Sequence, residues 1–184
     1  QDRSSAASDV YKRQFLMSSL IFGIGATMTS LVGMSIGARN ADRAEEIGWT
    51  GAGMSFVLGG VIGTLLAIFP HVWIPVFTDD PMVYETAKGF IQIVGPCLAI
   101  HGVGWALYFA SQGAGAMRGP VAALIARPIV AIGTAFLLLG PMNMGMTGVF
   151  IGAVGGMFAY TVIVTASMKG GAWRRQIPAS PAQT

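Results

Sequence analysis

Long uncharged stretches dominate the pattern of hydrophobic and polar positions along the chain. No Asp, Glu, Lys or Arg occurs from Gln14 to Ala38, from Ile47 to Thr78, from Gly89 to Met117, or from Pro128 to Met168. A helix that crosses the hydrocarbon core of a membrane needs about 20 apolar residues, so each of the first three stretches accommodates one such helix. The fourth stretch is too long for one helix and is interrupted by a turn-like run at 140–145.

This pattern predicts an all-α polytopic membrane protein. The period-two alternation of a half-buried strand is absent, and the apolar runs are too long for strands. The expected transmembrane helices lie at about 15–38, 49–70, 89–113, 119–140 and 146–168. Residues 15–168 are therefore expected to form a bundle of five helices, followed by a cytoplasmic tail at 169–184.

The amino-acid composition agrees with a lipid environment. Of the 184 residues, 53% are hydrophobic and only 10% are charged, whereas soluble domains carry about 25% charged residues. Mean hydropathy is +0.63. So few charges do not cover the surface of a water-soluble domain, and so large an apolar fraction is not typical of a disordered chain.

Several kinds of chemistry are disfavoured by the residue inventory. The single cysteine, Cys97, excludes an intrachain disulfide and a cysteine-cluster zinc site. The two histidines, His71 and His101, lack the spacing of a metal-binding helix. No catalytic triad or phosphate-binding loop is recognisable, so we expect no enzyme activity, no catalytic residues, no metal and no cofactor. The net charge of +3 is scattered, which argues against nucleic acid as a partner.

The distribution of basic residues predicts the orientation in the membrane. The loops at 39–46 and 118–120 and the tail at 169–175 carry Arg39, Arg43, Arg118, Lys169, Arg174 and Arg175. The opposite loops, at 71–88 and 140–146, carry only Lys88. Because basic residues favour cytoplasmic loops, we expect a multi-pass protein of the inner (plasma) membrane with a cytoplasmic C-terminus.

The first 14 residues do not fit this orientation. They change composition abruptly, lack the apolar region of a signal peptide, and would place Arg3, Lys12 and Arg13 outside the cell. We interpret residues 1–14 as foreign to the fold or disordered, with a preceding helix absent. The alternative is a native polar tail.

Three motifs resemble the MATE (multidrug and toxic compound extrusion) family and occur in the family's order. The run from Gly37 to Ala44 resembles the loop after the second helix of each half. The run from Val76 to Val83 is similar to the family's outer loop. Gln112 to Gly115, followed by Gly119 and Pro120, resembles its inner turn. The resemblance covers residues 15–175.

The resemblance implies a fold and an activity. With a cytoplasmic tail, the chain would be five helices of the six-helix C-terminal lobe, and the absent N-terminal lobe would be its partner. The family implies alternating access around a central cavity, with a solute exported in exchange for H⁺ or Na⁺. We expect drug-like solutes that are cationic or aromatic. The alternatives are a flippase of lipid-linked oligosaccharides from the same superfamily, and a non-transporting membrane subunit or enzyme.

One expected helix carries most of the candidate site. Cys97, His101, Trp105, Tyr108 and Gln112 follow one another at spacings of 4, 4, 3 and 4 residues, which places them on one helix face. Such a face is costly in hydrocarbon unless it meets protein or a wet cavity. The functional hypothesis is a cavity wall whose Trp and Tyr stack on the solute and whose His carries a proton. The alternative is ordinary packing between helices.

Two further features bear on the candidate site: a basic residue within an expected helix, and the lack of acidic residues in the expected helices. Arg127 lies about eight residues inside its expected helix and precedes Pro128. It either anchors the inner gate or contacts solute or lipid. No carboxylate occurs inside any expected span. Some sodium-coupled members of the family carry an Asp in the helix that corresponds to 89–113, so the coupling acid is expected outside this chain.

Small residues recur every four positions on three of the expected helices. They are Gly33 and Gly37; Gly51, Ser55, Gly59 and Gly63; and Gly148, Gly152 and Gly156. In lipid, such rows allow helix backbones to approach closely. We therefore expect them to mark the contacts between helices.

Overall fold

The structure is a computed structural model that describes residues 25–140, 142 and 144–176, all of them in helices, turns or loops without any strand. The expected all-α fold class is confirmed. A first helix covers residues 25–37 of the described chain. The elements that follow are α2 (Ala41–Ile68), α3 (Pro70–Trp73), η1 (Ile74–Val76), α4 (Pro81–Val94), α5 (Leu98–Gly113), α6 (Arg118–Leu139), α7 (Met146–Lys169) and η2 (Arg174–Gln176). The expectation for residues 1–14 concerns residues outside the described part.

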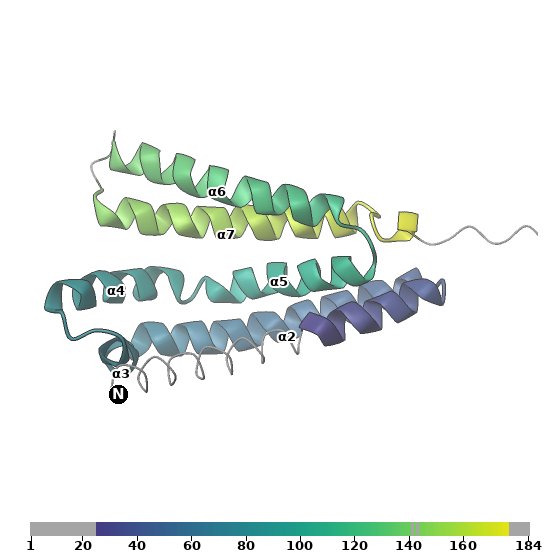
Figure 1. Cartoon of the computed structure of the whole chain (residues 1–184), viewed down its shortest axis with the longest axis horizontal. Helices are drawn as coiled ribbons and strands as arrows, with labels where there is room; N and C mark the ends of the chain where they lie inside the picture. Colours follow the sequence, from purple (N-terminus) through teal and green to yellow (C-terminus); the bar gives the residue numbers. More distant parts are fainter. Residues whose placement is uncertain (1–24, 141, 143, 177–184) are drawn as a thin grey trace, which may run out of the picture.

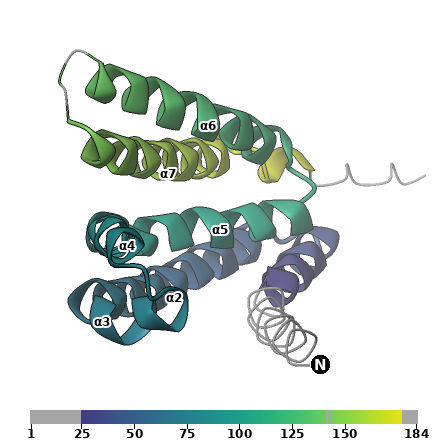
Figure 2. The same cartoon turned by 60° about the vertical axis from the view of Figure 1, so that its left-hand side comes forward.

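The long helices lie side by side and run in alternating directions (Figure 1). Helix α7 packs between α6 and α5, and α5 packs between α7 and α2. Seen from a second direction, α6 and α7 form one layer while α5, α2 and helix 25–37 form another (Figure 2). The loops at 38–40 and 114–117 and the segment after α7 meet at one end of the bundle. The expected basic loops therefore lie together.

Three described helices, α2, α6 and α7, are long and apolar enough to cross a membrane. The pair α4 and α5 satisfies the same criteria together, but it is bent by 66°. The single straight helix expected at 89–113 is therefore wrong. Pro96 has no N–H to donate and its ring clashes with the carbonyl four residues earlier, so α4 ends at Val94 and α5 begins at Leu98.

Two segments between the expected transmembrane helices also contain helix. Helix α2 begins at Ala41 instead of 49, because the side chain of Asn40 accepts a hydrogen bond from the backbone N–H of Arg43 at 3.0 Å. Much of the loop expected at 71–88 is also helical, in α3, η1 and α4. There Asp80 caps α4 by accepting from the N–H of Met82 at 2.8 Å. In each case a polar cap starts the helix inside a charged segment.

Glycines bring α6 and α7 together. A Cβ atom at Gly152 would lie 2.6 Å from the carbonyl oxygen of Ala131, and one at Gly156 would lie 2.7 Å from that of Arg127. Both distances are far below van der Waals contact, so only glycine permits this approach. The small-residue row of α7 thus marks a helix contact, as expected from the sequence.

The same principle joins α5 to its neighbours on the other side. A Cβ at Gly102 would lie 2.7 Å from the carbonyl oxygen of Ser55 on α2. At the end of α5, Gly113 lies directly against the backbone of Thr29 in helix 25–37. The hydroxyl of Thr29 also donates to the carbonyl oxygen of Phe109 at 2.9 Å. Helix 25–37 is therefore held beside α5, where it forms one wall of a crevice described below.

Large apolar side chains cover the outward faces of the bundle. On α6, Ile132 is 68% exposed and Phe136 is 77% exposed. Contiguous apolar surface of this kind is rare on soluble proteins. It suits contact with the hydrocarbon of a membrane.

The segment that follows α7 packs back onto the bundle. Trp173 is 1% exposed, and its indole N–H donates to Ser111 Oγ on α5 at 3.1 Å. Its ring lies over Gly48 of α2, where a Cβ would be 2.7 Å away. Trp173 therefore connects α7 with both α5 and α2.

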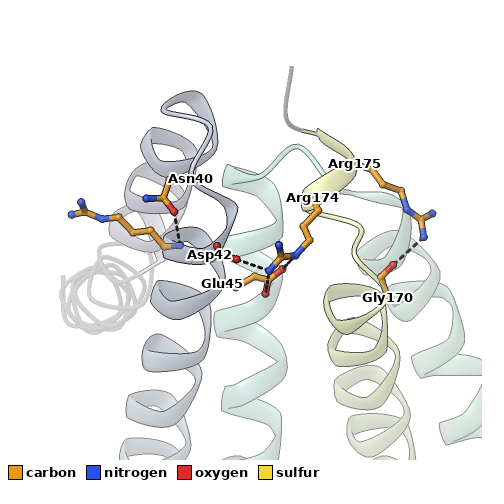
Figure 3. Close-up of polar contacts among 7 residues, drawn as sticks. Asn40, Asp42, Glu45, Gly170, Arg174 and Arg175 are labelled. Carbon is orange, nitrogen blue, oxygen red and sulfur yellow. Dashed lines mark hydrogen bonds and ion pairs between the residues drawn. The ribbon is translucent and has the colours of Figure 1, made fainter. Parts of the chain in front are cut away.

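Next to Trp173, an ion pair continues the connection at the surface (Figure 3). Arg174 donates to Glu45 Oε1 at 2.9 Å and to Asp42 Oδ1 at 2.6 Å. These hydrogen bonds, first to Glu45 and then to Asp42, raise the pKa of the Arg174 guanidinium above its ordinary value. Arg175 donates to the carbonyl oxygen of Gly170 at 2.9 Å. The described part of the expected tail is thus ordered against α2.

The glycine contacts predict a contrast between two substitutions of the same kind. Gly152→Ala should destabilise the chain by about 1–3 kcal/mol, because its Cβ meets backbone. Gly133→Ala on α6, where nothing lies within 4 Å, should be neutral or stabilising by up to about 1 kcal/mol. Thermal unfolding in detergent, followed by far-ultraviolet circular dichroism, measures both. Equal shifts for the two variants would contradict this packing.

The burial of Trp173 predicts a large loss of stability when its side chain is truncated. Trp173→Ala should lower the free energy of unfolding by about 3 kcal/mol, because a fully buried indole is removed. Trp73→Ala is the matched control, since that side chain is 43% exposed and should matter little. Denaturant titration in mixed micelles tests the pair, and a Trp173 variant as stable as the Trp73 variant would refute the described contact.

Candidate functional site

A crevice of about 590 Å³ lies between helix 25–37 and helices α5, α6 and α7. We call it the aromatic crevice. It is lined by Ala26, Thr29, Ser30, Trp105, Tyr108, Phe109, Gln112, Leu124, Arg127 and Tyr160. Four of the five residues proposed from the sequence, Trp105, Tyr108, Gln112 and Arg127, are among them. The fifth, His101, lies behind Trp105.

Helix α5 presents three of these side chains on one face, as the spacing predicts. Trp105, Tyr108 and Gln112 all lie on α5 and all line the crevice. Cys97 does not share this face as expected, because it lies in the bend before α5. Its thiol contacts the carbonyl oxygen of Ile93 at 3.5 Å. The helix break at Pro96 therefore removes Cys97 from the candidate site.

Aromatic rings follow one another along the wall of the crevice. The centroids of Trp105 and Phe109 lie 5.7 Å apart, and those of Trp105 and Tyr108 lie 6.1 Å apart. Behind Trp105, the ring centroid of His101 lies 5.6 Å from that of Tyr160 on α7. These separations are typical of attractive aromatic pairs. The wall is thus a connected set of rings, and Trp105 is 39% exposed.

His101 orients Trp105. The indole N–H of Trp105 donates to Nε2 of His101 at 2.8 Å. An indole nitrogen only donates, so Nε2 carries no proton and a neutral His101 has its proton on Nδ1. That Nδ1 atom is buried and has no hydrogen-bond partner in the described part of the chain. His101 therefore acts on the crevice through Trp105, which it holds in one orientation.

Arg127 brings a positive charge to the crevice. It lies nine residues after Arg118, the first residue of α6, which is about 13 Å along the helix axis. The close approach of Gly156 to its carbonyl oxygen sets α6 against α7 at this level. Tyr160, which also lines the crevice, is one helical turn further along α7. Among the described residues, Arg127 has no hydrogen bond or ion pair.

None of the described residues that line the crevice is acidic. The described carboxylates are Asp42, Glu45 and Glu46 in the first two turns of α2, Asp79 and Asp80 directly before α4, and Glu85 in its second turn. Arg127 is the charged residue of the lining. Among the described residues there is also no group of three or more potential metal ligands. The chemistry offered by the crevice is therefore stacking, hydrogen bonding and one positive charge.

Sequence reasoning missed several lining residues. Tyr160 follows Gly156 by four residues and so shares the face of the small-residue row on α7. That spacing is a signal from which it could have been found. Phe109, Thr29 and Ser30 carry no such signal, because their positions depend on how helix 25–37 packs on α5.

A larger hollow, of about 1100 Å³, separates helix 25–37 from α2. Its described lining contains none of the residues proposed from the sequence and no aromatic ring. Its polar residues gather at Asp42, Arg43 and Glu46, and Asp42 is already bound to Arg174. The aromatic crevice is the better candidate because it combines rings with unpaired polar groups.

Apolar helices of membrane-spanning length around a polar, aromatic crevice define a polytopic membrane protein with a solute-sized site. Comparison with protein families identifies which one. The model of the MatE family matches residues 5–137, and the chain belongs to the MATE family. The match begins inside the segment 1–14, whose foreign origin stays a prediction.

Two curated relatives have informative names. The chain is 23% identical over 156 residues to the "Probable multidrug resistance protein NorM" of Thermotoga maritima, covering 84% of this chain and 34% of the relative. It is 26% identical over 165 residues to the "Probable multidrug resistance protein YoeA" of Bacillus subtilis, covering 89% and 35%. The chain thus spans about a third of the length of these relatives. No solved structure matches it.

The bond between Trp105 and His101 predicts a tautomer. In ¹⁵N-histidine NMR spectra of the chain in micelles at neutral pH, the His101 ring should be protonated on Nδ1 and free on Nε2. Trp105→Phe removes the donor, so the Nε2-protonated tautomer should gain population. His71, far from the crevice, should not respond. A wild-type His101 protonated on Nε2 would refute the described hydrogen bond.

Proposed function

We propose that this chain is the C-terminal lobe of a multidrug efflux transporter and that the aromatic crevice is its part of the solute path. One observation carries the proposal: Trp105, Tyr108, Gln112 and Arg127 come together in a crevice between apolar helices. Polar and aromatic groups gathered at membrane depth are costly unless they serve a cavity. The names of the two relatives support drugs as the class of solute.

The lining supports aromatic solutes in particular. A volume of about 590 Å³ falls in the range of pockets that bind drug-sized molecules, roughly 300–1,000 Å³. The rings of Trp105, Tyr108 and Phe109 offer flat apolar surface, and Gln112 offers an amide. Of the solutes expected from the sequence, aromatic ones therefore find the most complementary walls. A purely structural subunit would have no need of a crevice beside Trp105.

Transport would proceed by alternating access against a second lobe, contributed by a sequence that corresponds to the remainder of the relatives. Exchange for H⁺ or Na⁺ requires a group that binds the ion. Na⁺ prefers several oxygen ligands, and the described lining of the crevice contains no carboxylate, so the coupling acid belongs to the other lobe in this proposal. For His101, the geometry supports a positioning role: a proton on Nε2 would break its bond to Trp105.

The proposed orientation places the C-terminus in the cytoplasm of a plasma membrane. The six basic residues that predict it lie on the loops, helix ends and tail gathered at one end of the bundle. In that orientation Trp173 and the Arg174 ion pair lie at the cytoplasmic end of the lobe. A flippase of a lipid-linked anion is the second candidate, and Arg127 in the crevice is the observation that favours it.

Efflux from whole cells tests the proposed function. Cells that express the complete reading frame encoding this chain should export aromatic dyes, and Trp105→Ala should reduce the initial efflux rate by about tenfold, as for a lost stacking contact of 1–1.5 kcal/mol. Trp49→Ala, on α2 outside the crevice, is the matched control and should export normally. Residues 1–184 alone should not export.

The dyes should include cations, neutral molecules and anions of similar size. Export of none of them by well-expressed protein, or equal rates for the Trp105 and Trp49 variants, would contradict the proposal.

A further inference from the structure

The charges and hydrogen-bond donors of the aromatic crevice carry an inference about its ligand, which rests on the proposed function. We infer that the crevice selects solutes that join an aromatic ring system to an anionic group such as a carboxylate. Arg127 would bind the anion while Trp105 and Tyr108 stack on the rings. The sequence leads us to expect solutes that are cationic or aromatic. The positive charge of Arg127 favours, among the aromatic ones, those that carry a negative charge.

The first argument is the uncompensated charge of Arg127. Arg127 lies in a helix of membrane-spanning length and is half-buried, and its guanidinium forms no hydrogen bond or ion pair with a described residue. A charge in such surroundings is costly unless it is paired or hydrated. A guanidinium matches a carboxylate in shape, because it donates two parallel hydrogen bonds to the two oxygens. An anionic solute would therefore supply what the described protein does not.

The second argument is the excess of donors over anionic acceptors in the lining. Gln112, Tyr108 and Tyr160 all line the crevice with Arg127, and their polar side-chain groups form no hydrogen bond with described residues. Each of them has an N–H or O–H to donate. The hydroxyl of Thr29, by contrast, already donates to backbone carbonyls. An anion accepts several hydrogen bonds at once, and the free groups of this lining suit it.

The third argument concerns a cationic solute. The faces of Trp105 and Tyr108 attract a cation, but the attraction falls off steeply with distance. Repulsion from Arg127 falls off only as the inverse of distance and is strengthened by the low dielectric of the surroundings. Among the lining residues that the structure describes, no carboxylate offsets that repulsion. A cation would therefore bind this lobe less well than an anion of the same ring system.

Equilibrium dialysis of the complete protein that contains this chain, purified in an uncharged detergent, tests the inference with three probes of one ring system. They are 2-naphthoate, 2-naphthylmethylammonium and neutral 2-naphthylmethanol. The naphthoate should bind about tenfold more tightly than the ammonium probe, as one charge-assisted hydrogen bond implies. Arg127→Gln should remove that preference by lowering the affinity for 2-naphthoate about tenfold, which is much more than it lowers the affinity for 2-naphthylmethanol. Arg127→Lys should retain part of the preference.

Arg118→Gln is the matched control, because it removes one positive charge from the same helix outside the crevice. It should keep the full preference for naphthoate. Thermal unfolding of each variant shows whether the fold is retained, and continued binding of 2-naphthylmethanol shows whether the crevice is retained. If Arg118→Gln lost the preference for 2-naphthoate as Arg127→Gln does, the preference would come from the overall positive charge of the protein. That result would overturn the role of Arg127.

The remaining outcomes separate this inference from the proposed function. Tighter binding of the ammonium probe overturns the anionic class but is compatible with drug efflux. Binding of none of the probes by the folded complete protein overturns both. Farnesyl phosphate forms a fourth arm: if it binds more tightly than naphthoate and depends equally on Arg127, the site recognises lipid-linked anions, and the aromatic solute is wrong.

Discussion

The structure depends on one constraint: hydrocarbon offers no hydrogen-bond partner to a polar group. Within the described chain, two groups of polar side chains show this constraint, one at an end of the bundle and one between helices. At the end where α2 begins, Arg174 binds Asp42 and Glu45. Between the helices, Trp105 binds His101, while Arg127 and Gln112 share the aromatic crevice. The outward faces are left to large apolar side chains such as Phe136.

Because apolar surfaces gain little from contact with one another in lipid, close backbone packing has to hold the helices. The glycines that permit it also shape the crevice. Gly156 sets α6 against α7 and brings Arg127 to the level of Tyr160. Gly113 sets helix 25–37 against the end of α5 and so closes the opposite wall. The same glycines therefore determine both the packing of the helices and the shape of the candidate site, because they set the distance between neighbouring backbones.

Much of this arrangement follows from the sequence, because charge-free length is a direct measure of what lipid tolerates. Helices α6 and α7 lie within about one residue of the bounds expected from that length. The prediction of a single helix at 89–113 was wrong because a hydropathy pattern does not register how Pro96 interrupts the helix backbone. The face of Trp105, Tyr108 and Gln112 was predictable from helical periodicity. The contributions of Phe109, Thr29 and Ser30 were not, because they arise from packing between distant segments.

The central claim is that lipid surrounds the bundle while the aromatic crevice admits water and solute. Thiol labelling in native membranes tests it most directly, in a Cys97→Ser background with Gln112→Cys or Ile132→Cys. Both positions are exposed in the protein, but only the first lies in the crevice. A water-soluble maleimide should label Gln112→Cys at least about tenfold faster than Ile132→Cys, since a thiol reacts as the thiolate, with equal labelling after denaturation. Equal rates in the membrane, or faster labelling at position 132, would contradict the account.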